Sequence, residues 1–208
     1  MDILSVPDSE RDDLWEKKFL DIFTNLKVKI SEDKPKAGID QWPYLHVETA
    51  KLGAEPVAKI CDWLSTRGIG LLVNPQKPVP DYIFTYGMIW NFKERGRFVE
   101  DRPATPPREF VLNEKTQVMA GAPSDAYLPP YVRSVLKQFF MEQGILMPRI
   151  LILSEDKKHF DLCLSLDSLG LPPATEHDGI AEAVQWFLPT HYSLVLVREK
   201  GLPAFVGL

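Results

Sequence analysis

Apolar residues recur along the chain at two spacings, which predict alternating helices and strands. Residues 15–26 carry large apolar side chains at helical spacing with charged residues between them, whereas residues 26–30 alternate strictly between apolar and charged. The same reading predicts these further elements in the first half: a strand at 42–49, a helix at 57–67, a buried strand at 69–73, a proline-containing loop at 74–80, and an aromatic strand or hairpin at 81–92.

Turn-forming residues gather at 121–130, and this cluster predicts a linker between two domains, residues 1–122 and residues 123–208. The second domain is predicted to contain, in order, a helix at 132–143, strands at 148–153 and 160–166, a helix at 180–188, a strand at 192–197, and a short edge strand near the end. This order, α-β-β-α-β-(β), places helices on one face of a sheet. We therefore predict an α+β protein made of two small mixed α/β domains.

Three stretches of the C-terminal half resemble the C-terminal domain of SseB-type proteins, the enhanced-serine-sensitivity group. They are residues 129–133 (PPYVR), 160–166 (FDLCLSL) and 193–197 (SLVLV). The resemblance does not extend to the N-terminal half. It implies a bacterial, cytoplasmic protein without established catalytic residues, and it assigns no site residue.

Charge and cysteine content argue against several classes of function. The formal net charge is −5 and no basic stripe is visible, so nucleic-acid binding is not expected. No apolar run approaches the roughly 20 residues that a membrane span needs, and the N-terminus lacks the pattern of a signal peptide. We therefore expect a cytoplasmic protein without membrane contact. Cys61 and Cys163 lie in apolar periodic segments and are expected to be buried, reduced thiols.

Candidate catalytic chemistry is sparse. The four histidines, His46, His159, His177 and His191, include no pair at helical spacing that would bind a metal. The chain contains no Gly-x-Ser-x-Gly elbow and no glycine-rich phosphate loop. We accordingly predict no catalytic residue, metal or cofactor.

The predicted N-terminal strands are rich in aromatic residues, which have two interpretations. The rings fill a core beneath the helices, or they form an amphipathic groove that recognises another protein, since Tyr and Trp are enriched in interfaces. For the groove, the candidate binding residues are Trp42, Tyr44, Tyr86 and Trp90. Gly87 would allow a turn that exposes at least one of Tyr86 and Trp90.

Three functions follow as hypotheses. The first is a non-catalytic binding or regulatory protein that recognises a protein partner through the aromatic face. The second is a small-ligand-binding protein or enzyme with a pocket between the domains, using His46, Glu48 and Asp81. The third is a domain that forms homo-oligomers by pairing its edge strands.

Overall fold

The computed structural model describes residues 3–49, 55–100 and 118–208, which belong to two compact units, Met1–Glu100 and Asp101–Leu208. The division falls upstream of the boundary predicted between residues 122 and 123. The strand β7 (Met119–Gly121) pairs with the sheet of the C-terminal unit, so residues before the predicted boundary already belong to that unit. The predicted linker at 121–130 instead leads into a helix, and Arg133 of that helix donates to the carbonyls of Pro123 and Leu128 at 2.6 and 2.9 Å.

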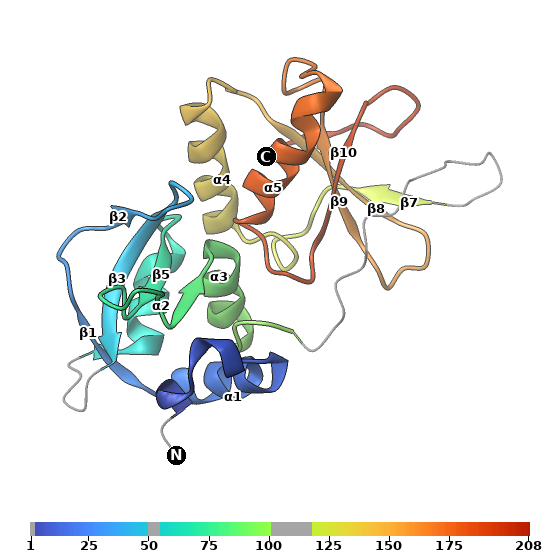
Figure 1. Cartoon of the computed structure of the whole chain (residues 1–208). Coiled ribbons are helices and arrows are strands. Elements are labelled where there is room, and N and C mark those ends of the chain that lie inside the picture. Colours follow the sequence, from blue (N-terminus) through green and yellow to red (C-terminus); the bar gives the residue numbers. More distant parts are fainter. Residues whose placement is uncertain (1–2, 50–54, 101–117) are drawn as a thin grey trace. The chain divides into compact units, whose positions relative to one another are not determined.

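The N-terminal unit contains a mixed sheet in the order β4-β1-β3-β5-β6, with β2 paired to β3 (Figure 1). Its strands are β1 (Lys27–Ile30), β2 (Lys36–Ala37), β3 (Pro43–Thr49), β4 (Glu55–Pro56), β5 (Gly70–Val73) and β6 (Tyr82–Phe84). Its helices are η1 (Ile3–Ser5), η2 (Asp8–Glu10), α1 (Asp13–Phe23), α2 (Val57–Ser65) and α3 (Tyr86–Arg95). The α+β prediction is therefore confirmed for this unit, with β3 and β5 parallel and α2 as their crossover.

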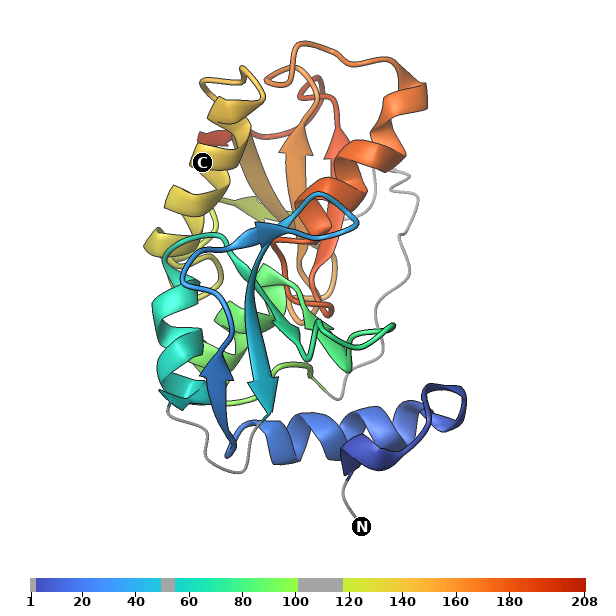
Figure 2. The same ribbon diagram turned by 60° about the vertical axis from the view of Figure 1, so that its left-hand side comes forward.

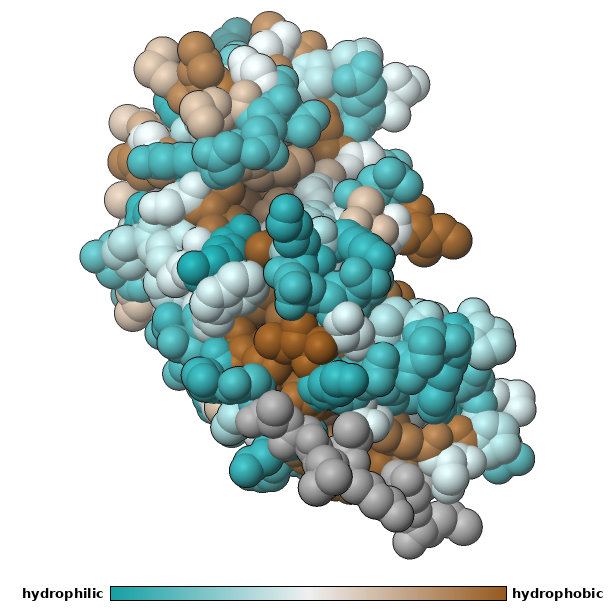
Figure 3. Space-filling model, turned by 90° about the vertical axis from the view of Figure 1, so that its left-hand side faces the viewer, coloured by the Kyte–Doolittle hydropathy of each residue, from teal (hydrophilic) through white to brown (hydrophobic). Residues whose placement is uncertain are grey.

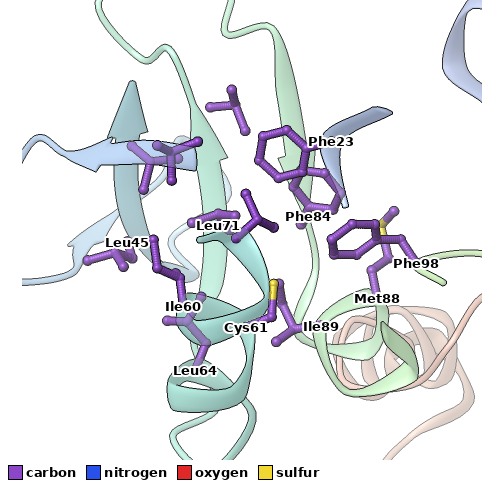
Figure 4. Close-up of a cluster of buried hydrophobic side chains, with 14 of the residues drawn as sticks. Phe23, Leu45, Ile60, Cys61, Leu64, Leu71, Phe84, Met88, Ile89 and Phe98 are labelled. Carbon is purple, nitrogen blue, oxygen red and sulfur yellow. The ribbon is translucent and has the colours of Figure 1, made fainter. Parts of the chain in front are cut away.

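Helices α1, α2 and α3 contribute to one core cluster on one face of the sheet (Figure 4). The strand side chains in the cluster are those of one alternating set: Val28, Leu45, Val47, Leu71, Val73 and Phe84. Helix α1 adds a stacked row, because Trp15, Phe19 and Phe23 recur every four residues and their neighbouring ring centroids lie 5.1 and 5.3 Å apart. The opposite face of β3 carries Tyr44, His46 and Glu48.

The prediction of an aromatic strand or hairpin over residues 81–92 is only partly correct. A strand is present at β6, but residues from Tyr86 onward form helix α3. The Thr85 side chain accepts a hydrogen bond from the Met88 amide at 3.3 Å and so caps the first turn. Gly96 ends the helix with a left-handed φ of 72°. Strand alternation therefore does not extend past Phe84.

The C-terminal unit has the predicted order, α4-β8-β9-α5-β10-β11, preceded by β7. Its elements are α4 (Pro130–Glu142), β8 (Arg149–Ser154), β9 (Asp161–Ser165), η3 (Ala174–Glu176), α5 (His177–Gln185), β10 (Ser193–Val197) and β11 (Val206–Gly207). The sheet order is β10-β9-β8-β11, with β7 also on β8. Strands β8 and β9 form the predicted antiparallel hairpin, and β10 runs beside β9 in parallel (Figure 2).

The two units repeat one arrangement of elements. In each, a helix precedes an antiparallel strand pair, a second helix follows, and the next strand returns parallel to the second strand of the pair. The matching elements are α1-β1-β3-α2-β5 and α4-β8-β9-α5-β10. They differ at the next strand, because β6 pairs with β5 whereas β11 pairs with β8. Each unit therefore has one parallel β-α-β crossover, whose carboxyl ends are where α/β folds commonly place ligand sites.

Candidate functional site

The predicted aromatic binding residues are mostly buried. Tyr44 is 1% exposed, Tyr86 0% and Trp90 2%, while Trp42 is half-buried. The expectation that Tyr86 or Trp90 is exposed is therefore wrong. Both residues lie one turn apart on helix α3, and the Tyr86 hydroxyl donates to the carbonyl of Ser65 at 2.5 Å.

Tyr44 has a specific packing role. An added Cβ would lie 2.7 Å from its ring at Gly38 and 2.6 Å from it at Gly70, so the ring occupies a slot that exists because both positions lack a side chain. Its hydroxyl donates to the Asp40 carboxylate at 2.5 Å. These contacts make Tyr44 a structural element of the β2–β3 end of the sheet.

The polar residues of the alternative hypothesis do not form one cluster. The Glu48 carboxylate accepts a hydrogen bond from Ser31 at 3.1 Å. His46 has a lowered pKa, mainly because burial disfavours the imidazolium, and the charge of Glu32 opposes this effect. Among the described residues, the side chain of Asp81 bonds to Arg11, Asn74 and Lys77, and neither His46 nor Glu48 takes part.

Asp81 instead anchors a polar cluster at the carboxyl ends of β3 and β5. Its side chain is fully buried and accepts from Arg11 at 2.7 Å, from Lys77 at 2.6 Å and from the Asn74 amide at 2.6 Å. The Asn74 side chain also joins the end of β3, because it donates to the Thr49 hydroxyl at 2.8 Å and accepts from the Thr49 amide at 2.9 Å. The sequence suggested Asp81 but not Arg11 or Asn74. The sequence offers one local signal, an asparagine directly after a buried strand. Asparagine is enriched at positions with a positive φ, and Asn74 adopts φ 53°.

The C-terminal unit has a similar cluster at the carboxyl ends of its own parallel pair, β9 and β10. Ser165, the last residue of β9, donates to the Glu199 carboxylate. Arg149 donates to the same oxygen at 2.7 Å, and the Glu199 amide donates to Asp167 at 2.9 Å. The Ser168 hydroxyl accepts from the Arg149 amide at 3.0 Å. Arg149, Ser165, Ser168 and Glu199 did not figure among the sequence candidates.

Both polar clusters are structural networks of hydrogen bonds and ion pairs that stabilise the ends of the strands. The Asp81 carboxylate is paired with Arg11 and accepts from Asn74, which directly follows β5. The Glu199 carboxylate is paired with Arg149 and accepts from Ser165 at the end of β9. Both carboxylates are therefore engaged by side chains of their own unit. Among the described residues, no group of three His, Cys, Asp or Glu side chains is arranged to hold a metal ion. The positions that would host a ligand in an open α/β sheet are therefore filled by the chain's own side chains.

The described surface does contain an apolar groove, which lies along helix α1 and is here called the α1 groove. It encloses about 550 Å³, within the roughly 300–1,000 Å³ of common ligand pockets. It is lined by Ile3, Val6, Asp12, Leu14, Trp15, Lys18, Asp21 and Ile22. The N-terminal segment forms one wall and is held there because Trp15 donates to the Ile3 carbonyl at 2.9 Å.

The apolar band of helix α1 is wider than the row of residues that it buries, which explains the groove. Its inner row packs into the core, whereas Leu14 and Ile22 on its outer side are 58% and 45% exposed. These two residues are eight positions apart, with Lys18 midway, so all three fall on one face of the helix. The face shown in Figure 3 is mostly hydrophilic, with apolar side chains reaching the surface in small areas. Single exposed apolar residues are normal, and a lined groove is the more informative feature.

Comparison with known proteins adds no family assignment. No protein-family model, no curated protein and no solved structure matches the chain. The resemblance to SseB-type proteins therefore stays a prediction. Within the described residues, no helix is both long and apolar enough to cross a membrane.

Proposed function

We propose that this chain is a non-catalytic binding protein that recognises an apolar segment of another protein through the α1 groove. Recognition of a protein partner is still proposed, but not through Trp42, Tyr44, Tyr86 and Trp90, because three of these residues are buried. The observation that carries it is the exposed edge of the apolar band of α1, where Leu14 and Ile22 line the groove and remain 58% and 45% exposed.

The lining favours an amphipathic peptide. Apolar side chains from the N-terminal segment and from α1 make up most of the lining, and the charged rim consists of Asp12, Lys18 and Asp21. Grooves of this kind accept the apolar face of a helical segment, with anchors spaced by three or four residues. Affinity would come from burying the apolar anchors, and the charged rim would set orientation.

Selection of random peptides against the whole chain tests the proposal. Peptides recovered from a displayed library are measured by calorimetry against the wild type, Leu14→Asp and Ile22→Asp. Each substitution is expected to weaken binding at least about tenfold, because a charge replaces an apolar contact. Both variants should keep their stability to within about 0.5 kcal/mol, since the side chains are exposed.

Val79→Asp provides the matched control, because Val79 is 55% exposed and does not line the groove. It should leave peptide affinity unchanged. Peptides that bind equally well to all three variants would place recognition elsewhere and refute the assignment of the α1 groove. Failure to select any peptide with apolar anchors would count against protein recognition by this groove.

A further inference from the structure

The outer edge of β10 differs from the matching edge of β5 in the N-terminal unit. In the N-terminal unit, β5 is flanked by β3 on one side and by the antiparallel strand β6 on the other. The matching strand β10 pairs with β9, and among the described residues no strand pairs with its other side. The architecture thus accommodates an antiparallel strand at a position where the C-terminal unit has none described.

The composition of β10 offers no protection to this edge. Its sequence is SLVLV, without the Lys, other charged residues or Pro that commonly block the pairing of edge strands. All five of its residues are partly exposed, whereas most residues of β9 are buried. An unprotected apolar edge is a template for another strand.

The backbone direction shows which groups the edge presents. The Leu166 amide donates to the Val197 carbonyl at 2.9 Å, so the peptide groups of Val197 face β9. Alternation directs those of Val195 to the same side and those of Leu194 and Leu196 outward. The outward groups are two N–H donors and two C=O acceptors.

We propose that two copies of this chain associate by antiparallel pairing of their β10 strands about a two-fold axis at Val195. In this register Leu194 of each copy faces Leu196 of the other, and their outward groups form four hydrogen bonds. Val195 faces its own counterpart, Leu opposes Leu, and no charge is brought to the contact. This self-complementarity favours a second copy over an unrelated strand, as a two-fold interface requires.

Proline substitution tests the hydrogen bonds selectively. The N–H of Leu196 points away from β9, so Leu196→Pro removes an outward donor and leaves the β9–β10 ladder intact. Leu196→Ala shortens the same side chain but keeps the donor. Sedimentation of the full chain from about 1 to about 200 µM covers the weak affinities expected for pairing through one short strand.

The wild type and Leu196→Ala are expected to reach twice the chain mass of 23.7 kDa as concentration rises. In Leu196→Pro the dissociation constant should rise at least about tenfold, because two of the four hydrogen bonds are lost. A wild type that stays monomeric throughout would overturn the proposal. A dimer that persists unchanged in Leu196→Pro would also overturn it, because it would use another surface.

Disulfide formation tests the register independently of proline tolerance. A non-hydrogen-bonded antiparallel pair has Cα atoms about 4.5 Å apart, within the range that a disulfide spans. Val195→Cys should therefore form a covalent dimer under mild oxidation. Val197→Cys is the control, because the proposed register places it opposite Ser193 and far from its own counterpart. Absence of a Val195→Cys dimer, or equal cross-linking of both variants, would exclude this pairing.

Discussion

Substitution of Asp81 by Asn tests whether the polar cluster at the ends of β3 and β5 holds the N-terminal unit together. Asparagine keeps the shape of the side chain but removes its charge. Arg11, whose side chain is 11% exposed, would keep its ion pair with the exposed carboxylate of Asp8 at 2.9 Å and its hydrogen bonds to the backbone carbonyls of Val6 and residue 81, both at 3.2 Å. Lys77 is 39% exposed and can return to water, so its loss of a partner costs less.

These contacts set the expected magnitude. Removing one partner of a buried ion pair costs about 3–5 kcal/mol, and hydrogen bonds to charged groups contribute about 1.5–3 kcal/mol each. The retained contact of Arg11 to Asp8 and the exposure of Lys77 place the expected loss at the lower end, about 2–4 kcal/mol. Urea unfolding at pH 7 measures it. Glu55→Gln, which removes a carboxylate from the exposed pair with Lys59, should change stability by less than about 0.5 kcal/mol.

The pH dependence supplies a second readout of the same cluster. Burial alone would raise the pKa of Asp81, but hydrogen bonds from Lys77, Asn74 and Arg11 outweigh it and lower the pKa below its ordinary value. The ionised form is thus favoured in the folded state. Its contribution is complete above the unfolded pKa of about 3.9 and is lost as pH falls through the lower folded value. The stability difference between wild type and Asp81→Asn should be constant from about pH 5 to 7 and shrink below about pH 4. A loss under about 1 kcal/mol at pH 7, or a difference that grows on acidification, would refute the reasoning.

Three further predictions concern packing. Gly70→Ala should lower the melting temperature because its Cβ would lie 2.6 Å from the backbone of β6, whereas Gly179→Ala, with open space at a helical position, should stabilise by about 0.5–1 kcal/mol. Tyr86→Phe should lose about 1–3 kcal/mol in chemical unfolding, because it leaves the Ser65 carbonyl without this hydrogen bond; an unchanged midpoint would contradict that role. Both native thiols are buried, and burial raises their pKa, so a thiol reagent should label them only as the protein unfolds, and rapid native labelling would contradict this.

Much of the fold follows from periodicity because the relevant segments are long enough to show it. The α-β-β-α-β-β order of the C-terminal unit was predictable from helical spacing in α4 and alternation in β9. The error over residues 86–95 has a physical cause. Tyr82 and Phe84 alternate as in a strand, and Tyr86 continues the alternation by coincidence, although Thr85 caps a helix there. A capping residue followed by Met88, Ile89 and Phe92 was the available signal.

The residues that form the two polar clusters could not be predicted from the sequence to lie together. Arg11 reaches Asp81 across seventy positions, and Arg149 reaches Glu199 across fifty. Neither pair has a spacing that local rules recognise, because only the pairing of strands brings them together. The predicted domain boundary differs from the division between residues 100 and 101 for a related reason. The proline-rich stretch at 121–130 has the composition of a linker, but its carbonyls serve as acceptors for Arg133.

The α1 groove and the β10 edge lie in different units, and this separates the two proposed associations. Leu14 belongs to one unit and Leu196 to the other, so we expect their effects on binding to be additive. We expect Leu14→Asp to lose peptide binding yet still dimerise, and Leu196→Pro to be monomeric yet bind peptide with wild-type affinity. Titrating each variant with a selected peptide during sedimentation measures both properties at once. If Leu14→Asp also became monomeric, the α1 groove would belong to the self-association surface, and the two proposals would reduce to one. If peptide binding instead dissolved the wild-type dimer, the peptide would compete for the β10 edge, and recognition would occur by strand addition.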